Sequence, residues 1–214
     1  MVTKLSECLY CHYIANNKEQ LDDFFENFFA KQEESLSVLE AVEGEELNPP
    51  VYEIALKQEL VYLRASFIEN EKLKKNITVQ NYLRLYGRYD LAQEVDAFLD
   101  IIVKPGLSLR RLIKETVDKF IAHYDKPTDE SKSIYDYCLR LFSQKSPLAL
   151  QRLIPLIQGF VMWLCTEMWY DAGELGVSMS DRNDETRELF VQQRKSIIAS
   201  FSSAVESCNS GELM

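Results

Sequence analysis

Residues 108–124 read SLRRLIKETVDKFIAHY, and the spacing of their apolar side chains is the clearest indication of the fold. The apolar residues recur every three or four positions, which places them on one side of a helix that turns about 100° per residue. They are Leu109, Leu112, Ile113, Val117, Phe120 and Tyr124. KPG at 104–106 ends the preceding segment and KPTDE at 126–130 ends this one. The stretch therefore predicts an amphipathic helix that packs on a core.

The rest of the chain shows the same helical periodicity. The 214 residues include only seven Gly and six Pro, which favours a few long helices over many short strands. No segment alternates as a strand would. Asn48 can cap the helix that follows it, and Pro155 should kink a helix. The sequence predicts an all-α bundle of six to eight helices in one domain, with the other helices over 18–42, 51–71, 78–88, 90–103, 131–144, 147–171 and 181–206.

Acidic residues gather near the start of the chain. Residues 1–50 hold eleven acidic and three basic residues, whereas residues 51–214 hold twenty-three and twenty-one. We expect residues 1–50 to form an acidic helix and linker packed on the bundle, residues 51–206 to form the bundle, and residues 207–214 to be a polar tail. The acidic helix is either a solvated amphipathic helix, a cover for a basic patch or a nucleic-acid mimic.

The sequence favours a cytoplasmic protein without a membrane segment. The first twenty residues carry charges and lack the apolar core of a signal peptide. The longest apolar run, residues 153–165, is too short to span a bilayer. Five scattered cysteines suit free thiols in a reducing compartment.

Three residues near the end of the 108–124 helix are candidates for chemistry. On a helical wheel His123 lies at the edge of the apolar stripe beside Leu112 and Thr116, and Lys119 lies one turn earlier on the same flank. Asp118 is predicted to point away from the core. His123 is either a general acid or base or a histidine packed at a helix seam.

The segment VDKFIAHYD (117–125) resembles the signature of the HEPN superfamily, in particular its abortive-infection branch (AbiU type). The ending IAHYD (121–125) is typical of that branch. The preceding segments ALKQELVYLRASF (55–67) and NITVQNYLRL (76–85) also fit. The resemblance covers residues 50–165. It implies an all-α, HEPN-like fold and a homodimer in a prokaryotic defence or toxin-type system. In active members a histidine and an arginine from two subunits cleave RNA without metal, with the ribose 2′-hydroxyl as the nucleophile.

The sequence departs from this pattern where the motif arginine belongs. If Asp118 takes the place of the polar residue that follows the arginine, Val117 occupies the arginine's place. Lys119 lies on the right flank but lacks the two-pronged guanidinium. Arg64 could supply that group from a neighbouring helix, or it could be an ion-pair partner. In the catalytic interpretation His123 moves protons, Lys119 and Arg64 stabilise charge, and Asp118 orients.

A basic stretch precedes the motif, because residues 104–126 carry six Lys or Arg against three Asp or Glu. Arg110, Arg111, Lys114 and Lys126 are candidates for RNA binding, the alternative being a solvated helix face. We expect a non-catalytic HEPN-like component that binds RNA or a partner protein. The alternative is a metal-independent endoribonuclease that uses His123.

The pattern Cys8-Leu-Tyr-Cys11-His12 suggests a metal or haem site at first sight. A structural zinc site needs four ligands, and no second Cys or His pair follows in the sequence. Covalent haem attachment requires export, for which the sequence gives no signal. We therefore predict neither a metal nor a cofactor.

Overall fold

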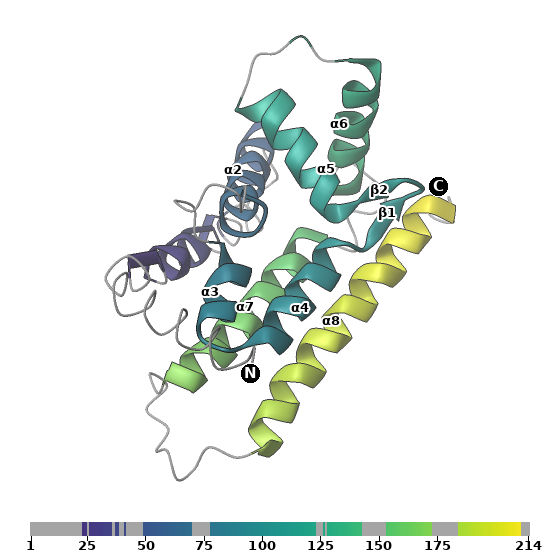
Figure 1. The fold of residues 1–214 in the computed structure, drawn as a ribbon. Helices are drawn as coiled ribbons and strands as arrows, with labels where there is room; N and C mark the ends of the chain where they lie inside the picture. Colours follow the sequence, from purple (N-terminus) through teal and green to yellow (C-terminus); the bar gives the residue numbers. More distant parts are fainter. Residues whose placement is uncertain are drawn as a thin grey trace, which may run out of the picture.

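The protein was analysed as a computed structural model that describes residues 23–24, 26–35, 37–38, 41, 49–69, 78–122, 126, 128–142, 153–172 and 184–210. These residues form a helical bundle with one short two-stranded sheet (Figure 1). The predicted all-α fold is confirmed. None of the described helices is both long and apolar enough to cross a bilayer.

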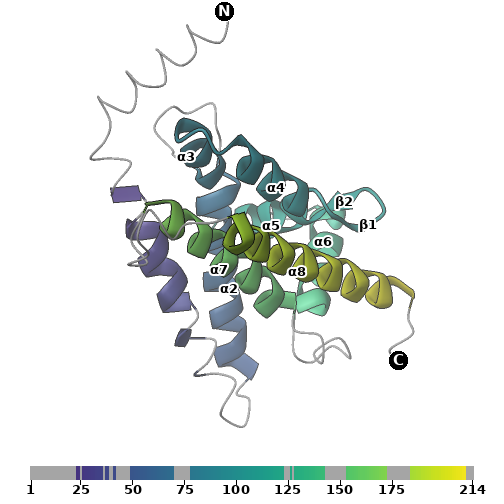
Figure 2. The same ribbon diagram turned by 90° about the horizontal axis from the view of Figure 1, so that it is seen from below.

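The first helical residues lie beside α2, Pro49–Phe67, in both views of the ribbon (Figures 1 and 2). We call them the N-terminal helix; its described residues are 23–24, 26–35, 37–38 and 41. α2 buries a stripe of apolar side chains at helical spacing, which consists of Leu56, Leu60, Leu63 and Phe67. The predicted cap, Asn48, lies outside the described residues.

Two short helices follow, α3 (Val79–Leu85) and α4 (Tyr89–Leu99). Thr78, where a helix was predicted to begin, caps α3, because its Oγ1 accepts a hydrogen bond from the Asn81 backbone N–H at 3.3 Å. The helix predicted to reach residue 88 ends at Leu85. Gly87 has a φ of 77°, a left-handed conformation that glycine adopts without steric cost and that turns the chain into α4.

A hairpin replaces the end of the helix predicted over 90–103. β1 (Ile102–Lys104) pairs antiparallel with β2 (Leu107–Ser108), so the expectation of no strand was wrong. Pro105 and Gly106 form the turn, with Gly106 at a φ of 76°. Strands of three and two residues are too short to produce a recognisable alternation of apolar and polar side chains.

The helix predicted over 108–124 changes its geometry partway along. Ser108 caps α5 (Leu109–Thr116), because its Oγ accepts from the Arg111 N–H at 3.3 Å. From Val117 to Ile121 the chain forms a π-helical turn, η1. There the Ala122 N–H donates to the Val117 carbonyl at 2.8 Å, five residues back instead of four.

The last three helices are α6 (Asp129–Phe142), α7 (Leu153–Ala172) and α8 (Asp184–Ser210). α8 runs along one edge of the bundle against α7, and its C-terminal end reaches β1 (Figure 1). Residues 207–210, predicted to belong to a polar tail, are therefore helical. Pro155, predicted to kink the helix, is the third residue of α7 as described.

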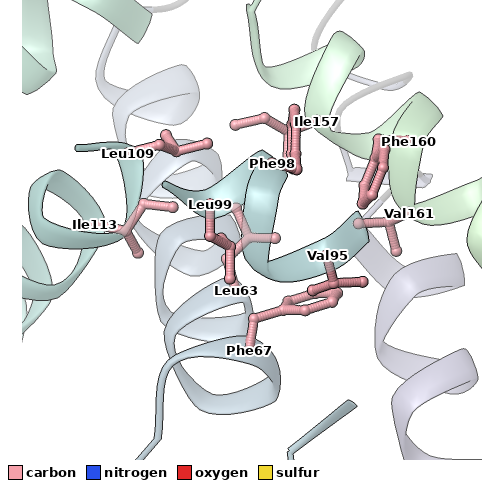
Figure 3. Close-up of a pocket in the computed structure, with 10 residues that line it drawn as sticks. All are labelled: Leu63, Phe67, Val95, Phe98, Leu99, Leu109, Ile113, Ile157, Phe160 and Val161. Atoms are coloured by element: carbon pink, nitrogen blue, oxygen red, sulfur yellow. The ribbon is translucent and has the colours of Figure 1, made fainter. Parts of the chain in front are cut away.

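The centre of the core is formed by α2, α4, α5 and α7 (Figure 3). It surrounds a void of about 10 Å³, roughly the space of one water-sized sphere. Every side chain around this void is apolar, so it offers no hydrogen bond to a ligand and carries no site. Its lining consists of Leu63, Phe67, Val95, Phe98, Leu99, Leu109, Ile113, Ile157, Phe160 and Val161.

Candidate functional site

The structure brings together two of the predicted catalytic residues, Arg64 of α2 and Asp118 of η1. Arg64 Nε donates to Asp118 Oδ1 at 3.1 Å, and Arg64 Nη1 donates to Glu69 Oε2 at 2.6 Å. The Arg64 side chain is only 15% exposed, and the two carboxylates are about one-third exposed. Arg64 is therefore an ion-pair partner, which was one of the two roles that its sequence context left open.

Asp118 was predicted to point away from the core, and its half-buried carboxylate meets the partly exposed Arg64 side chain at the α2–η1 contact. The wheel behind that prediction assumed about 100° per residue along the whole stretch. A π turn holds more residues per turn, so each residue of η1 turns through a smaller angle. The wheel therefore drifts by a small angle at each residue from Val117 onward.

Val117, which stands where the resemblance would place the motif arginine, is part of the core. Its side chain is 4% exposed and belongs to the main apolar cluster of the bundle. A guanidinium at this position would need a carboxylate partner to offset its loss of water. The surroundings of residue 117 therefore suit the valine that the sequence provides.

The remaining members of the predicted catalytic set are placed only in part. Lys119 is half-buried on η1. His123 lies outside the described residues, and so do Cys8, Cys11 and His12. The structure thus places Asp118 and Lys119 on the segment that leads to His123, and Arg64 of α2 beside that segment.

The predicted RNA-binding arginines, Arg110 and Arg111, form ion pairs with carboxylates of the same chain. Arg110 Nε donates to Asp100 Oδ1 at 2.8 Å, and Arg110 Nη2 donates to Asp96 Oδ1 at 2.9 Å. Arg111 Nη2 donates to Glu130 Oε1 at 2.5 Å. Burial alone would lower the pKa of Arg110, but its bonds to Asp100 and Asp96 raise it, so the group stays charged and paired.

The predicted RNA-binding lysines are exposed, with Lys114 on α5 and Lys126 between η1 and α6. Two exposed lysines attract a phosphate backbone less strongly than four exposed cations would, and the sequence had suggested four. The structure therefore places two of these four cations in ion pairs and leaves two at the surface.

The most deeply buried charges lie elsewhere, in a charge cluster that sequence reasoning missed. Arg194 of α8 has no exposed side-chain surface, and Glu167 of α7 is 2% exposed. Arg194 Nη1 donates to Glu167 Oε2 at 2.7 Å, and Nε and Nη2 donate to the two oxygens of Glu94 at 2.9 and 3.0 Å. Arg88 donates to the other oxygen of Glu167 and to Asp171.

This charge cluster ties α8 to α4 and α7. Burial alone would lower the pKa of Arg194, but the carboxylates of Glu94 and Glu167 raise it, so its charge is retained inside the protein. The one sequence signal was Glu167, a carboxylate in the strongly apolar stretch of α7. Since every carboxylate has an arginine partner, a structural role explains the cluster.

The described part of the acidic N-terminal helix does not bear out the idea that it covers the predicted basic patch. Its recorded contacts are with α2, α3 and α7: Glu34 with Tyr62, Phe24 with Tyr82, and Phe29 with Trp169. The predicted basic patch lies on and after α5. Among the described residues, the carboxylates that pair with Arg110 and Arg111 are Asp96, Asp100 and Glu130, none of them from the N-terminal helix.

Within the ranges that the structure describes, no group of three or more His, Cys, Asp or Glu is placed to hold a metal ion. Comparisons of the chain with family models, with curated protein sequences and with solved structures gave no match.

Proposed function

We propose that this chain is a HEPN-like, non-catalytic component of a prokaryotic defence or toxin-type system, cytoplasmic and homodimeric, whose ligand is a protein and not RNA. The observation that carries the choice between these ligands is the pairing of Arg64, Arg110 and Arg111 with carboxylates of the same chain. The HEPN assignment itself rests on the resemblance of residues 117–125.

RNA binding depends on cations that neutralise phosphates and release counterions. A guanidinium that already holds one or two carboxylates must give up those bonds before it can contact a phosphate. The formal net charge of −10 adds a long-range repulsion. Both effects favour a protein ligand.

The test is RNA binding measured by fluorescence anisotropy with labelled single-stranded and hairpin RNA at low salt. We expect no saturable binding by the wild type. The matched variant carries Asp96→Asn, Asp100→Asn and Glu130→Gln, which free Arg110 and Arg111 without removing them. This variant should gain binding that weakens as salt rises. Wild-type binding that disappears in an Arg110→Ala, Arg111→Ala variant would contradict the proposal.

A second candidate function, a metal-independent endoribonuclease, is favoured by the position of Arg64. Its guanidinium reaches η1, the segment that precedes His123, so charge stabilisation from α2 is compatible with proton transfer by His123. Structured RNA would then be cleaved by the wild type and left intact by His123→Ala. Arg64→Lys should also lose most activity, because lysine cannot replace a two-pronged guanidinium. Cleavage that survives in His123→Ala would exclude this candidate.

The homodimer is tested separately by light scattering coupled to size-exclusion chromatography. The chain has a mass of 24.9 kDa, so a dimer would scatter as a particle of twice that mass. A monomer at concentrations above ~100 µM, well above the Kd of a specific assembly, would contradict this part of the proposal.

A further inference from the structure

A second buried polar contact, distinct from the charge cluster, joins the N-terminal helix to the bundle. Ser35 of that helix donates through Oγ to Glu59 Oε2 of α2, and Gln158 Nε2 of α7 donates to Ser35 Oγ at 3.4 Å. The three residues are 3%, 0% and 4% exposed. We call them the Glu59 cluster.

The Glu59 cluster is incompletely bonded. The second carboxylate oxygen, Glu59 Oε1, is buried and has no hydrogen-bond partner among the described residues. The amide nitrogen of Gln32, one turn before Ser35 on the N-terminal helix, is also buried without a recorded partner. A carboxylate with an unbonded buried oxygen is costly when ionised, whereas a protonated carboxyl carries no charge and can itself donate one bond.

Among the described residues, the groups bonded in this cluster with Glu59 are neutral: Ser35 of the N-terminal helix and Gln158 of α7. Tyr62 of α2 is a titratable group that feels the charge of Glu59, and Lys31 of the N-terminal helix lies over the Tyr62 ring with Nζ 5.8 Å from its centroid. Other charged side chains of these elements are bonded elsewhere: Glu34 with Tyr62 and Gln58, Lys57 with Glu53, Arg64 with Asp118 and Glu69, and Glu167 with Arg88 and Arg194.

We propose that Glu59 is a proton-operated latch, which holds the N-terminal helix on α2 and α7 when it is protonated and loosens that helix when it ionises. Release of the helix exposes Glu59 to water, where its charge is solvated. The latch goes beyond the proposed function, because it concerns how one helix is attached and requires no RNA or partner.

The direction of the pH dependence follows from burial. Burial raises the pKa of Glu59 above its ordinary value of 4.5, against smaller lowering effects of Ser35 and Gln158. The released state therefore ionises first as pH rises above 4.5, and attachment weakens from there up to the pKa of the docked state. In that window the equilibrium constant for release rises by up to ~10-fold per pH unit, since one proton is lost on release.

Hydrogen exchange of the full chain between pH 5 and 8, followed by mass spectrometry, measures this release. Peptides from residues 26–35 should show an opening constant that rises with pH after correction for the intrinsic exchange rate. Glu59→Gln keeps the shape of the side chain and cannot ionise, so its opening constant should be independent of pH. Glu33→Gln, which replaces an exposed carboxylate on the same helix, is the matched control and should keep the wild-type slope.

Tryptophan fluorescence gives a second readout that does not rely on exchange. Phe29 of the N-terminal helix packs edge-on against Trp169, with ring centroids 4.8 Å apart. In a Trp163→Phe background, emission from Trp169 should shift to longer wavelength as pH rises, and this shift should be absent when Glu59→Gln is added.

Three results would overturn the latch. The first is a flat opening constant in the wild type, and the second is an unchanged slope in Glu59→Gln. The third is exchange that rises in parallel in α7 and α8, because the proton would then be linked to unfolding of the whole bundle. If Glu59→Gln does not fold, the wild type alone still tests the latch. Its hydrogen exchange should then rise with pH in residues 26–35 and not in α7 and α8.

Discussion

Two peripheral helices are attached to the same bundle by opposite electrostatic means. α8 is held by the charge cluster, in which buried Arg194 bonds with Glu94 and Glu167. The N-terminal helix is held by the Glu59 cluster, in which, among the described residues, the buried carboxyl accepts from Ser35 and Gln158 donates to Ser35. In the first contact each buried charge has an opposite charge beside it, whereas in the second there is none.

The comparison shows that burial alone does not decide how a polar contact behaves. A buried charge is tolerated when an opposite charge pairs with it. Removing one partner leaves the other side chain ionised, buried and unpaired. A carboxyl without a cation avoids that cost by binding a proton, so its contact depends on pH. The four predictions that follow test this difference, beginning with the largest expected effect.

Arg194→Ala should break the attachment of α8. It leaves Glu94 and Glu167 without their main cation, and breaking a buried pair in this way costs about 3–5 kcal/mol. Urea denaturation measures the loss of unfolding free energy. The control is Arg187→Ala, whose 42%-exposed side chain pairs with Asp171 and should contribute about 0–1 kcal/mol. Similar losses in the two variants would mean that burial of the pair is unimportant.

Ser35→Ala should weaken the N-terminal helix by a smaller amount. It removes a neutral hydrogen bond and leaves a second carboxyl oxygen of Glu59 unsatisfied, at a cost of about 1–3 kcal/mol. The loss should appear as faster hydrogen exchange in residues 26–35, with little change in α7 and α8. A loss spread evenly over the bundle would contradict the idea of a separate attachment.

Tyr137→Phe tests the C-terminal end of α8. The buried Tyr137 hydroxyl donates to the Val103 carbonyl and bonds with Asn209 Oδ1 at 3.2 Å, while Asn209 Nδ2 donates to Val103 at 2.9 Å. Losing a neutral bond while Asn209 remains should cost about 0.5–1.5 kcal/mol in urea denaturation.

Tyr137 also contributes a pH dependence that the phenylalanine variant removes. Burial raises the pKa of Tyr137 from 10.0 to about 12. The unfolded chain therefore ionises at this residue first, and stability falls as pH rises from about 10 to about 12. The unfolding free energies of the wild type and of Tyr137→Phe should therefore approach each other across this window. A constant difference would contradict the raised pKa of Tyr137.

Asp118→Asn should have the smallest effect. The Arg64–Asp118 pair is partly exposed, and Arg64 retains Glu69 in the variant. Pairs of this kind contribute about 0–1 kcal/mol. A loss comparable with that of Arg194→Ala would show that the α2–η1 contact belongs with the charge cluster in strength.

Much of the fold could be predicted, because helical periodicity and capping are local properties of the sequence. The helix starts at Thr78 and Ser108 and the apolar stripe of residues 108–124 were read from side chains only a few positions apart. The β1–β2 hairpin was missed because its strands are too short to carry a pattern. The π turn was missed because a wheel at about 100° per residue cannot represent it.

The candidate site was less predictable, since ion pairs form between residues far apart in the chain. Arg64 and Asp118 are 54 positions apart, and Arg194 and Glu94 are 100 apart. The composition of residues 104–126 indicated a basic stretch that includes Arg110 and Arg111. Only their neighbours in space show that Asp96, Asp100 and Glu130 already occupy two of them.

The spacing of apolar residues was enough to establish that this protein is helical and which faces of its main helices turn inward, because burial of apolar side chains repeats with the helical period. The tertiary structure decided which charges are paired and which carboxyl is left without a cation. That outcome depends on distances between different helices, and the electrostatic energy of a side chain depends on those distances and on its exclusion from water.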